Sequence, residues 1–413
     1  MLHDPFDGLF DSEDPDASGL IAGATAERWM QTVGWGRRAD LYTYSQPLAG
    51  PPGARADVGG REVVSASSYD YLGLASHPDV ISAAADAVQR FGVGTGGVRL
   101  LTGTCDLHRE LEATLAAHYS QGAALAFSSG YLANVAVLAA LLGPDDVAVL
   151  DARCHRSIVD GCRLARVPVR LWRHNDVEHL DRVLSEAAPE ARKTLVVTEG
   201  VFSMDGDLGP LAEIVETAER HGAYVMVDEA HALGAVGARG EGSWGALGVD
   251  PSRVHLWTGS LSKGLGASGG FVACGADVGA FLQHGAAPFF FSQALAPAST
   301  AAALASLGVM QREPERHAAL RRNADLLREG VQAAGFDVGA SASPIVPVVV
   351  GDDEAAYRLA RDLWEHGVWA TAVVFPAVAR GAARLRLCAT ALHTPEDIDA
   401  ICAALAACAP VPA

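Results

Sequence analysis

Lysine is almost absent from this sequence. Of the 31 basic residues among its 413 positions, only Lys193 and Lys263 are lysines. Lys193 precedes an apolar run in EARKTLVV, where a solvated surface lysine is the ordinary interpretation. Lys263 stands in TGSLSKGLGASGG, among small residues and hydroxyls with no charged neighbour. Because apolar surroundings disfavour the ammonium form, Lys263 is either a structural lysine in a glycine-rich turn or an available amine nucleophile.

Other absences exclude several classes of protein. Acidic residues outnumber basic ones by 49 to 31, giving a net charge of −18 without a basic run, which argues against nucleic acids and anionic membranes. No apolar run approaches the roughly 20 residues that span a bilayer. The acidic N-terminal stretch lacks the basic and apolar regions of a signal peptide, so we expect a cytoplasmic protein. The seven cysteines form no C-x-x-C pair, which favours reduced thiols over a metal site or disulfide framework.

Apolar strand-like runs alternate with helical patterns between residues 123 and 274. Continuous apolar strands in this alternation predict an α/β fold with a mostly parallel central sheet, buried on both faces. We expect an N-terminal arm over residues 1–60 with a short helix near 24–34, and a large α/β domain over 61–297. Residues 298–413 are expected to form a smaller C-terminal α+β domain that begins with one long alanine-rich helix.

The segment from Phe91 to Thr104 contains a G-x-G-x-x-G spacing at Gly92, Gly94 and Gly97. A dinucleotide fingerprint follows a strand, whereas a helical pattern precedes this segment, and no acidic residue closes the unit about 20 residues later. We therefore interpret it as a flexible loop that lines a pocket.

Chemically distinctive residues follow five of the predicted strands. The carboxyl ends of parallel strands form one ligand-binding edge, so these residues are expected to converge on one site. They are Ser129, Gly130, His155, Ser203, Asp228, His231 and Lys263.

An amine, a carboxylate and two histidines at one sheet edge favour a phosphorylated aldehyde cofactor. Lys263 would form a Schiff base with it, and Asp228 would pair with a pyridinium nitrogen. Backbone N–H groups of Gly130 and Tyr131 at a helix N-terminus, with the hydroxyls of Ser260 and Ser262, would bind a phosphate. Taken singly, Asp228 could be a helix cap, and His155 and His231 could be satisfied core or loop histidines.

Several motifs together resemble the α-oxoamine synthase family. They are YDYLGL, HRELEATLAAHY, SSGYLAN, TEGVFSMDGDLGPL, VDEAHALGAVGARGEG and TGSLSKGLG. They run in the family's order and spacing from about residue 69 to 399. The resemblance implies a fold-type-I pyridoxal 5'-phosphate (PLP) transferase that acts as a homodimer with its active site at the subunit interface. Such an enzyme condenses an amino acid with an acyl thioester, carried on coenzyme A or an acyl-carrier protein, and releases CO2 and free thiol.

The resemblance also implies roles for individual residues. Lys263 matches the Schiff-base lysine, Asp228 the pyridinium partner, His231 the residue near the phenolic oxygen of the cofactor, and His155 the histidine stacked on its ring. Ser203 matches a serine close to the cofactor, and Gly130 and Tyr131 match the phosphate loop. Ser292 matches a hydroxyl that reaches the phosphate from the other subunit. Arg386, in RLRLCATALHT, matches the arginine that grips the substrate carboxylate, a task that suits a bidentate guanidinium.

Three departures from the family pattern concern the substrate. Ser260 replaces a frequent threonine and keeps the hydroxyl. Tyr69 replaces a frequent asparagine, as in the serine palmitoyltransferase branch, and Val98 replaces a hydroxyl residue that would favour a carboxylated acyl group. We therefore expect an apolar acyl chain, and Tyr69, Val98 and Arg386 as substrate-binding residues.

Several alternatives remain open from the sequence. One is the 8-amino-7-oxononanoate synthase branch, which uses alanine and a pimeloyl thioester. Another is a fold-type-I aldolase or aminotransferase, and a third is a non-catalytic subunit, although such a subunit would be expected to lack Lys263. In the arm, Arg37 and Arg38 could reach a substrate or could be solvated.

Overall fold

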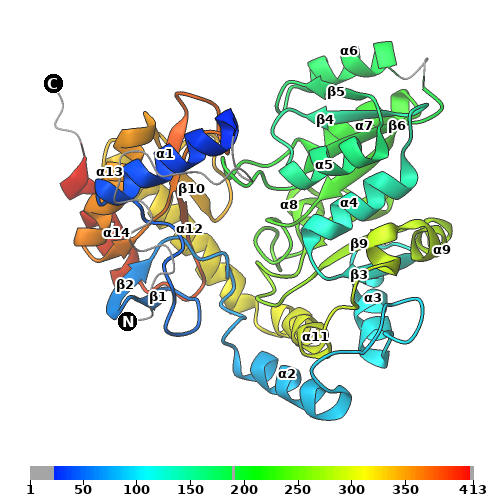
Figure 1. The fold of residues 1–413 in the computed structure, drawn as a ribbon, viewed down its shortest axis with the longest axis horizontal. Coiled ribbons are helices and arrows are strands. Elements are labelled where there is room, and N and C mark those ends of the chain that lie inside the picture. Colours follow the sequence, from blue (N-terminus) through cyan, green and yellow to red (C-terminus); the bar gives the residue numbers. More distant parts are fainter. Residues whose placement is uncertain (1–22, 188–190, 410–413) are drawn as a thin grey trace.

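The molecule has two lobes of unequal size, joined by a long helix and several loops (Figure 1). The computed structural model describes residues 23–187 and 191–409. The larger lobe is built on a seven-stranded sheet and the smaller one on two three-stranded sheets. This arrangement confirms the predicted α/β fold, with a mostly parallel central sheet and a smaller C-terminal domain.

The central sheet has the strand order β3-β9-β8-β7-β6-β4-β5. β9 is antiparallel to both of its neighbours, whereas β5, β4, β6, β7 and β8 pair in parallel. Most of these strands are short runs of buried residues, as expected for a sheet covered on both faces. Their bounds are β3 Ala123–Phe127, β4 Val147–Asp151, β5 Val169–Trp172, β6 Thr194–Glu199, β7 Tyr224–Asp228, β8 Leu256–Ser260 and β9 Gly270–Cys274.

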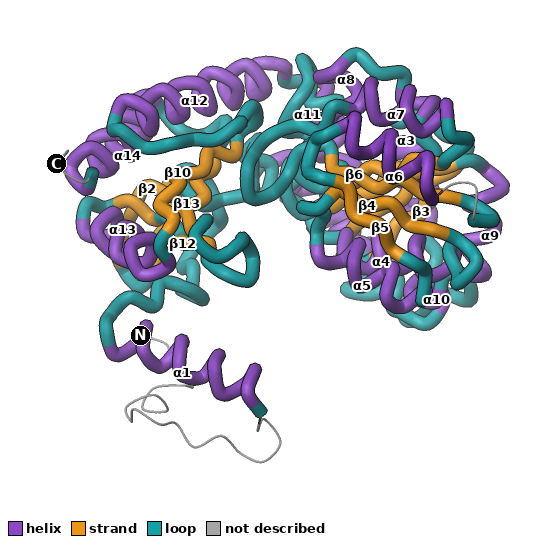
Figure 2. Tube along the Cα trace, turned by 90° about the horizontal axis from the view of Figure 1, so that it is seen from above, coloured by secondary structure: helices purple, strands orange, loops and turns teal. Residues whose placement is uncertain are grey.

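Helices cover both faces of the central sheet (Figure 2). One face packs against α3 (Asp106–His118), α6 (Val177–Ala187) and α7 (Leu211–Arg220). The other packs against α4 (Gly130–Leu141), α5 (Arg156–Ala165), α9 (Ala276–Gly285) and α10 (Ala287–Phe290). α8 (Ser243–Leu247) and a short 3-10 turn (Pro251–Arg253) lie between β7 and β8.

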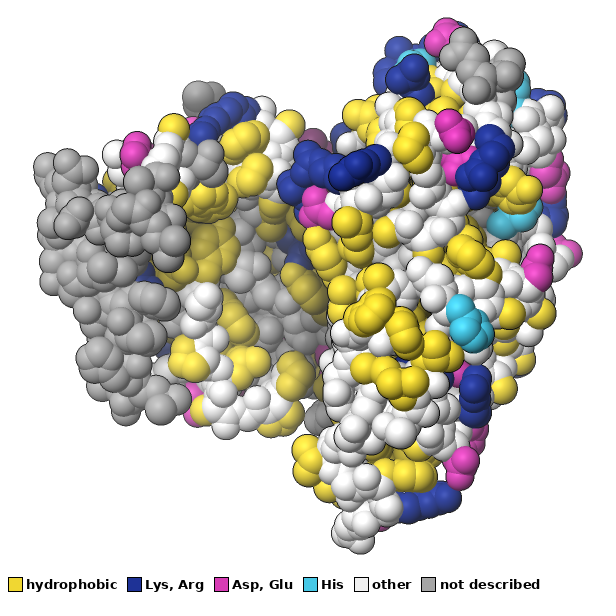
Figure 3. Space-filling model, turned by 45° about the vertical axis from the view of Figure 1, so that its right-hand side comes forward, with side chains coloured by type: hydrophobic (Ala, Val, Ile, Leu, Met, Phe, Trp, Pro, Cys, Tyr) yellow, Lys and Arg dark blue, Asp and Glu magenta, His cyan; other side chains and the backbone are white. Residues whose placement is uncertain are grey.

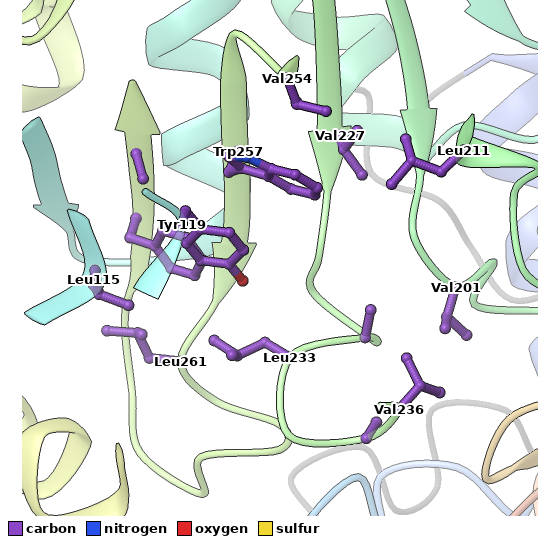
Figure 4. Packing of buried hydrophobic residues seen from close by; sticks show 14 of the residues in the cluster. Leu115, Tyr119, Val201, Leu211, Val227, Leu233, Val236, Val254, Trp257 and Leu261 are labelled. Atoms are coloured by element: carbon purple, nitrogen blue, oxygen red, sulfur yellow. The ribbon is translucent and has the colours of Figure 1, made fainter. Parts of the chain in front are cut away.

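Aromatic residues fill the core on the α3 side of the sheet. The rings of Tyr119 and Trp257 stack with their centroids 5.0 Å apart, and Tyr119 also stacks on Phe271 at 5.5 Å. Leu233 and Leu261 lie close to these rings, in the loops that follow β7 and β8 (Figure 4). This packing fixes the two loops that carry His231 and Lys263.

The smaller lobe combines chain segments from both ends. β10 (Ile345–Gly351), β13 (Ala383–Cys388) and β12 (Ala372–Val373) form one sheet, covered by α12 (Pro314–Ala333), α13 (Asp353–Glu365) and α14 (Pro395–Cys408). The second sheet has the order β1-β2-β11. Its strands are β1 (Arg55–Val58), β2 (Arg61–Ser65) and β11 (Val368–Trp369), so residues 61–65 join the smaller lobe although they fall in the range predicted for the large domain.

The predicted long alanine-rich helix is α11, and a second helix, α12, follows it that was not predicted separately. α11 (Pro297–Arg312) is capped by Glu313, and α12 begins at Pro314. Proline lacks a backbone N–H and clashes with the preceding turn, so it starts a helix more readily than it continues one. α2 (Pro78–Phe91) begins with a proline in the same way, and α1 (Ala24–Arg38) runs four residues beyond its predicted end. None of the described helices is long and apolar enough to cross a membrane.

Candidate active site

The carboxyl ends of the parallel strands bring most of the predicted residues to one edge of the sheet. Ser203 follows β6, and Asp228 is the last residue of the adjacent strand β7. Ser260 is the last residue of β8, which pairs with β7 on its other side. His155 follows β4, on the other side of β6. These side chains are far apart in the sequence, but the parallel strands bring them together at one edge of the sheet.

A helix N-terminus and two hydroxyls form a compact anion-binding group. Ser129 caps α4 by accepting a hydrogen bond from the N–H of Leu132 at 3.2 Å, and the first N–H groups of a helix have no partner within it. The Cα of Gly130 is so close to Ser260 that a Cβ added to Gly130 would lie 3.1 Å from the Ser260 Cβ. Ser260 Oγ and Ser262 Oγ are 2.7 Å apart. These donors suit a phosphate.

Close packing of glycines allows this arrangement. A Cβ added to Gly270 on β9 would lie 2.3 Å from the backbone nitrogen of Gly130, so a side chain there would push the start of α4 off the sheet. The glycines at these two positions are needed for close approach of backbones, since neither has a positive φ. This close approach sets the position of the candidate phosphate site.

Lys263 lies half-buried in the loop that follows β8. Burial lowers the pKa of its amine, while the carboxylates of Asp228 and Glu199 oppose that shift. A lysine amine with a lowered pKa is more often unprotonated and therefore more nucleophilic. This environment differs from that of Lys193, which lies 3.7 Å from Asp146 in an ion pair.

A hydrogen-bond network centred on Asn134, a residue that the sequence analysis did not identify, holds the Asp228 carboxylate. Its Oδ1 accepts a hydrogen bond from the N–H of Ala230 at 2.9 Å, and its Oδ2 accepts one from Asn134 Nδ2 at 2.7 Å. Asn134 Nδ2 also donates to Ser157 Oγ at 2.9 Å, and its Oδ1 accepts from the Thr258 hydroxyl at 2.7 Å. Asn134 is buried on α4, so it fixes the orientation of Asp228 through α4, α5 and β8.

The same hydrogen-bond network extends to His155. Ser157 Oγ lies 2.8 Å from His155 Nδ1, and the Ser157 N–H donates to that nitrogen at 3.3 Å, so His155 is the N-cap of α5. Asn134 therefore connects the carboxylate predicted to face a pyridinium nitrogen with the histidine predicted to stack on the ring. A signal for it existed in the sequence, because it is the single polar side chain in the apolar helix pattern YLANVAVLAALL.

Glu199 is a second residue that the sequence analysis missed. It ends β6 beside Asp228 in the strand register, is buried, and accepts a hydrogen bond from the His155 N–H at 2.5 Å. Burial and the neighbouring Asp228 carboxylate raise the pKa of Glu199 well above its usual value. Its position at the end of a wholly buried strand, in the motif TEG, was the available signal.

His231 is buried against two tyrosines. Its Nδ1 lies 2.8 Å from the hydroxyl of Tyr71, and its ring meets that of Tyr69 edge-on at 5.9 Å. Complete burial lowers the pKa of His231 well below its usual value, and the positive charge of Lys263 acts in the same direction. His231 is therefore a neutral imidazole, able to donate or accept one hydrogen bond at Nε2.

Arg386 on β13 reaches from the smaller lobe to this site. Its Nη1 donates to the carbonyl of Ser203 at 3.1 Å, and its guanidinium lies over the Tyr69 ring, 4.3 Å from the centroid. Its Nε is buried and has no hydrogen-bond partner among the described residues. Burial lowers the pKa of Arg386, but a guanidinium remains protonated at neutral pH, so it can bind a carboxylate.

The remaining predicted residues lie at the margins of the site. The Tyr131 hydroxyl donates to Asp160 at 2.7 Å, away from the helix N-terminus. Val98 pairs with Gln293 in an isolated β-bridge, which places the glycine-rich loop beside Ser292. Arg37 and Arg38 end α1, and the Arg37 guanidinium lies over the Tyr42 ring, 4.8 Å from its centroid.

The donors and charges fit PLP. A helix N-terminus with two hydroxyls suits its phosphate, a fixed carboxylate suits its ring nitrogen, and a buried amine suits its aldehyde. The chain matches the family described as aminotransferase class I and II over residues 61–405. Fold and site thus define a PLP-dependent enzyme of fold type I.

Comparison with individual proteins narrows this class. An 8-amino-7-oxononanoate synthase from Exiguobacterium sibiricum is 46% identical over 345 residues, which cover 84% of this chain and 88% of that protein. Another, from Anaeromyxobacter dehalogenans, is 46% identical over 88% of this chain and 91% of its own length. Among solved structures, a serine palmitoyltransferase from S. paucimobilis with bound PLP superposes with a TM-score of 0.89 at 32% identity, covering 93% of this chain and 97% of that one.

The chain belongs to the α-oxoamine synthases. It is a PLP-dependent acyltransferase that condenses an amino acid with an acyl thioester and releases CO2. The family, cofactor and reaction type expected from the sequence are therefore confirmed.

Proposed function

We propose that this chain condenses alanine with a pimeloyl thioester to form 8-amino-7-oxononanoate. The product that names the curated relatives has nine carbons, a terminal carboxylate, a ketone at C7 and an amine at C8. Joining the α-carbon of alanine to the carbonyl of a seven-carbon dicarboxylic thioester, with loss of the alanine carboxylate, gives that skeleton. The supporting observation is the 41–46% identity of these relatives over most of the chain, against 32–34% for the serine palmitoyltransferase structures.

Each residue of the site has a separate role in the proposed reaction. PLP, when bound, accepts electrons from the α-carbon of the amino acid, so that its proton can be removed. The Lys263 amine, with its lowered pKa, is the group that removes this proton. Arg386 holds the substrate carboxylate through its free Nε, and Asp228 keeps the ring nitrogen protonated. Gly130, Tyr131, Ser260 and Ser262 bind the phosphate.

The bonds that change balance without an external oxidant or reductant. The α-carbon forms a bond to the thioester carbonyl carbon, and the C–S bond breaks to release the thiol. The bond between the α-carbon and the carboxylate then breaks, and CO2 leaves. A proton then returns to the α-carbon, and the Lys263 ammonium that took the first proton supplies it.

A second candidate is the apolar acyl donor expected from the sequence. Tyr69 and the half-buried Val98 favour it, because neither supplies a charge to a terminal carboxylate of the donor. The experiment that separates the candidates compares pimeloyl with heptanoyl thioesters, which have the same chain length and differ in the terminal carboxylate. Alanine, serine and glycine are each tested with both donors, and CO2 and free thiol are measured together.

Preference for pimeloyl with alanine supports the first candidate, and preference for heptanoyl supports the second. Release of neither CO2 nor thiol with any pair would overturn both. Lys263→Ala is expected to remove turnover and the visible absorbance of the bound cofactor, since no amine remains to attach it. Lys193→Ala is the matched control and should retain both.

We also propose that two copies share the active site. Three apolar side chains beside Val98 and Ser292 are strongly exposed in the single chain: Val93 at 80%, Leu101 at 72% and Phe291 at 79%. Exposed apolar groups at a functional site mark a contact surface. A homodimer would cover them and would bring Ser292 to the phosphate of the other subunit. Sedimentation should give a dimer, and Phe291→Asp should weaken it.

A further inference from the structure

The hydroxyl of Tyr71 contacts a residue of the site but has no part in the reaction described above. Tyr71 is wholly buried in the segment between β2 and α2. Its hydroxyl lies 2.8 Å from His231 Nδ1, which is the one hydrogen-bond partner that it has among the described residues. Burial raises the pKa of Tyr71 well above its usual value, so the group is a neutral phenol. Its single polar contact is therefore the imidazole of His231.

Contacts with both lobes hold Tyr71 in place. Its ring belongs to the core of the large lobe, together with Leu72 and Leu74. Its backbone carbonyl accepts a hydrogen bond at 2.7 Å from the N–H of Ala391, which follows β13 of the small lobe. Figure 3 shows a hollow between the two lobes, so a residue that is bonded to both is fixed at their junction. The Tyr71 hydroxyl therefore has a defined position relative to His231.

Two tyrosine rings fix the orientation of the His231 imidazole. Tyr69 meets it edge-on with centroids 5.9 Å apart, and Tyr71 lies tilted against it at 6.3 Å. The two nitrogens of an imidazole point in nearly opposite directions, so Nε2 points away from Tyr71 when Nδ1 faces it. Lys263 and His155 are close enough to affect the pKa of His231, and no described residue is hydrogen-bonded to its Nε2. Nε2 is therefore available to a ligand in the site.

Only one arrangement of protons satisfies both groups of this pair. If Nδ1 carried a proton, it would donate to the phenol, and the hydroxyl hydrogen of Tyr71 would be buried without an acceptor. A doubly protonated imidazole would leave the same hydrogen without an acceptor and would also bury a charge, which burial and the positive charge of Lys263 oppose. When Nδ1 is bare, the hydroxyl donates to it, and no buried hydrogen is left unpaired. The proton of the neutral imidazole is then on Nε2.

We propose that Tyr71 is a positioning residue that holds His231 as the Nε2–H tautomer, which donates a hydrogen bond to the phenolic oxygen of PLP. This inference rests on the site proposed above, but not on which amino acid or acyl thioester is the substrate. An ionised phenolic oxygen can only accept hydrogen bonds, so it needs a donor at this position. A bare Nε2 would instead turn a lone pair toward that oxygen. Tyr71 thus determines whether His231 attracts the cofactor or repels it.

The first test measures the tautomer directly. The protonated and bare nitrogens of a neutral imidazole have widely separated nitrogen chemical shifts, so NMR of protein with isotopically labelled histidine distinguishes them. The chain has 14 histidines, and the signals of His231 are those that disappear in His231→Gln. We expect the Nε2–H tautomer alone in the unaltered protein, with and without PLP, and a mixture of both tautomers in Tyr71→Phe. A proton on Nδ1 of the unaltered protein would overturn the proposal.

The second test measures the effect of the tautomer on the cofactor. Tyr71→Phe keeps the ring and its packing and removes only the hydroxyl. We expect the Kd of PLP to rise about three- to tenfold and the visible band of bound PLP to shift, because the proton is no longer fixed on Nε2. One spectral titration gives both values. If neither the Kd nor the band changes, the proposal is wrong, whatever tautomer the NMR spectrum shows.

Tyr119→Phe is the matched control. Tyr119 is also wholly buried in the core of the large lobe, but its hydroxyl has no hydrogen-bond partner among the described residues. Removing this hydroxyl should leave the Kd of PLP within about twofold and the tautomer of His231 unchanged. Effects as large as those of Tyr71→Phe would mean that core packing, and not the contact with His231, is responsible.

A double-mutant cycle tests whether Tyr71 acts through His231. The side-chain amide in His231→Gln can donate from a position near that of Nε2 and has no tautomer to fix. Adding Tyr71→Phe to His231→Gln should therefore change the Kd of PLP by less than about twofold, against three- to tenfold in the unaltered protein. Equal factors in both backgrounds would contradict the proposal. These measurements use no substrate, so an error in the proposed substrates would leave their results unchanged.

Discussion

At the scale of single residues, the site depends on groups that never need to touch a substrate. We propose that Lys263 and Asp228 carry the chemistry, and Asn134 sets the direction of the Asp228 carboxylate with a hydrogen bond of 2.7 Å. The same side chain donates to Ser157, which contacts His155. Because Asn134 is buried, losing its amide would leave several polar groups without partners.

Asn134→Ala should therefore weaken cofactor binding and catalysis together. Outer-shell partners of a catalytic group typically account for about 10–100-fold in affinity or activity. We expect the dissociation constant of PLP to rise by that factor and the pH dependence of the cofactor absorbance to shift, because Asp228 and His155 lose their common anchor. Both are measured by spectral titration.

The fold must be checked separately for this variant. Thermal unfolding of the cofactor-free protein tells whether Asn134→Ala is merely unstable, and Asn134→Asp keeps the shape while changing the donor. A variant that binds PLP with unchanged affinity and an unchanged pH profile would show that Asp228 needs no such support.

At the scale of elements, His174 connects the end of β4 with the loop after β6. His174, after β5, lies between Asp151 at the end of β4 and Asp207 in the loop after β6, at 2.9 Å and 2.7 Å. Burial alone would lower the pKa of His174, but the hydrogen bonds to the two carboxylates outweigh it and raise the pKa to about 9. The imidazolium therefore fixes the segment that carries Ser203 and Asp205.

This arrangement predicts a pH-dependent stability. A pKa raised from 6.5 to about 9 in the folded state stabilises fully below about pH 6.5, and this stabilisation is lost as the pH rises through about 9. At about 1.4 kcal/mol per pKa unit, the contribution is on the order of 3 kcal/mol. The free energy of unfolding of His174→Gln should thus be lower than that of the unaltered protein at pH 6, with a smaller difference at pH 9.5.

Denaturant titrations at the two pH values measure this difference. His284→Gln, at an exposed position near the end of α9, is the control and should show no such trend. An equal difference at both pH values would mean that His174 acts through its shape and not through its charge.

At the scale of the whole molecule, an ion-pair cluster joins the two lobes beside Arg386, the arginine that we propose binds the substrate carboxylate. Asp205 of the large lobe contacts Arg153 of the same lobe at 2.9 Å and Arg384 of the small lobe at 2.7 Å. Arg384 and Arg386 are two residues apart on β13 and so point to the same side of the strand. The position of Arg386 therefore depends on the contact between the lobes.

Asp205→Asn should loosen this contact. The Arg384 side chain is only 10% exposed, so removing its partner leaves a poorly solvated charge and costs about 1–3 kcal/mol, less than for a wholly buried pair. We expect the KM for the amino acid to rise more than kcat falls, because Arg386 is displaced. Steady-state kinetics and thermal unfolding measure the two effects.

The control for this variant is Asp325→Asn, whose partner Arg328 lies one turn away on the same helix. It removes an ion pair of similar length without separating the lobes. If it raises the KM as much as Asp205→Asn does, the effect cannot come from the contact between lobes.

Much of the fold and chemistry was predictable from the sequence. The strands of the central sheet are continuous apolar runs, and a parallel sheet binds ligands beyond its strand ends, so the residues after those runs were the ones to examine. Lys263 stood out because lysine is so rare in the chain. The second helix, which begins at Pro314 directly after the alanine-rich one, was not predicted separately.

What the sequence determined by itself was the type of each element and the chemical nature of the side chains at the strand ends, since periodicity and residue type are local. Only the tertiary structure decided how these side chains are oriented. Asn134, Glu199 and Tyr71 contact their partners from distant elements, and no local pattern records such contacts.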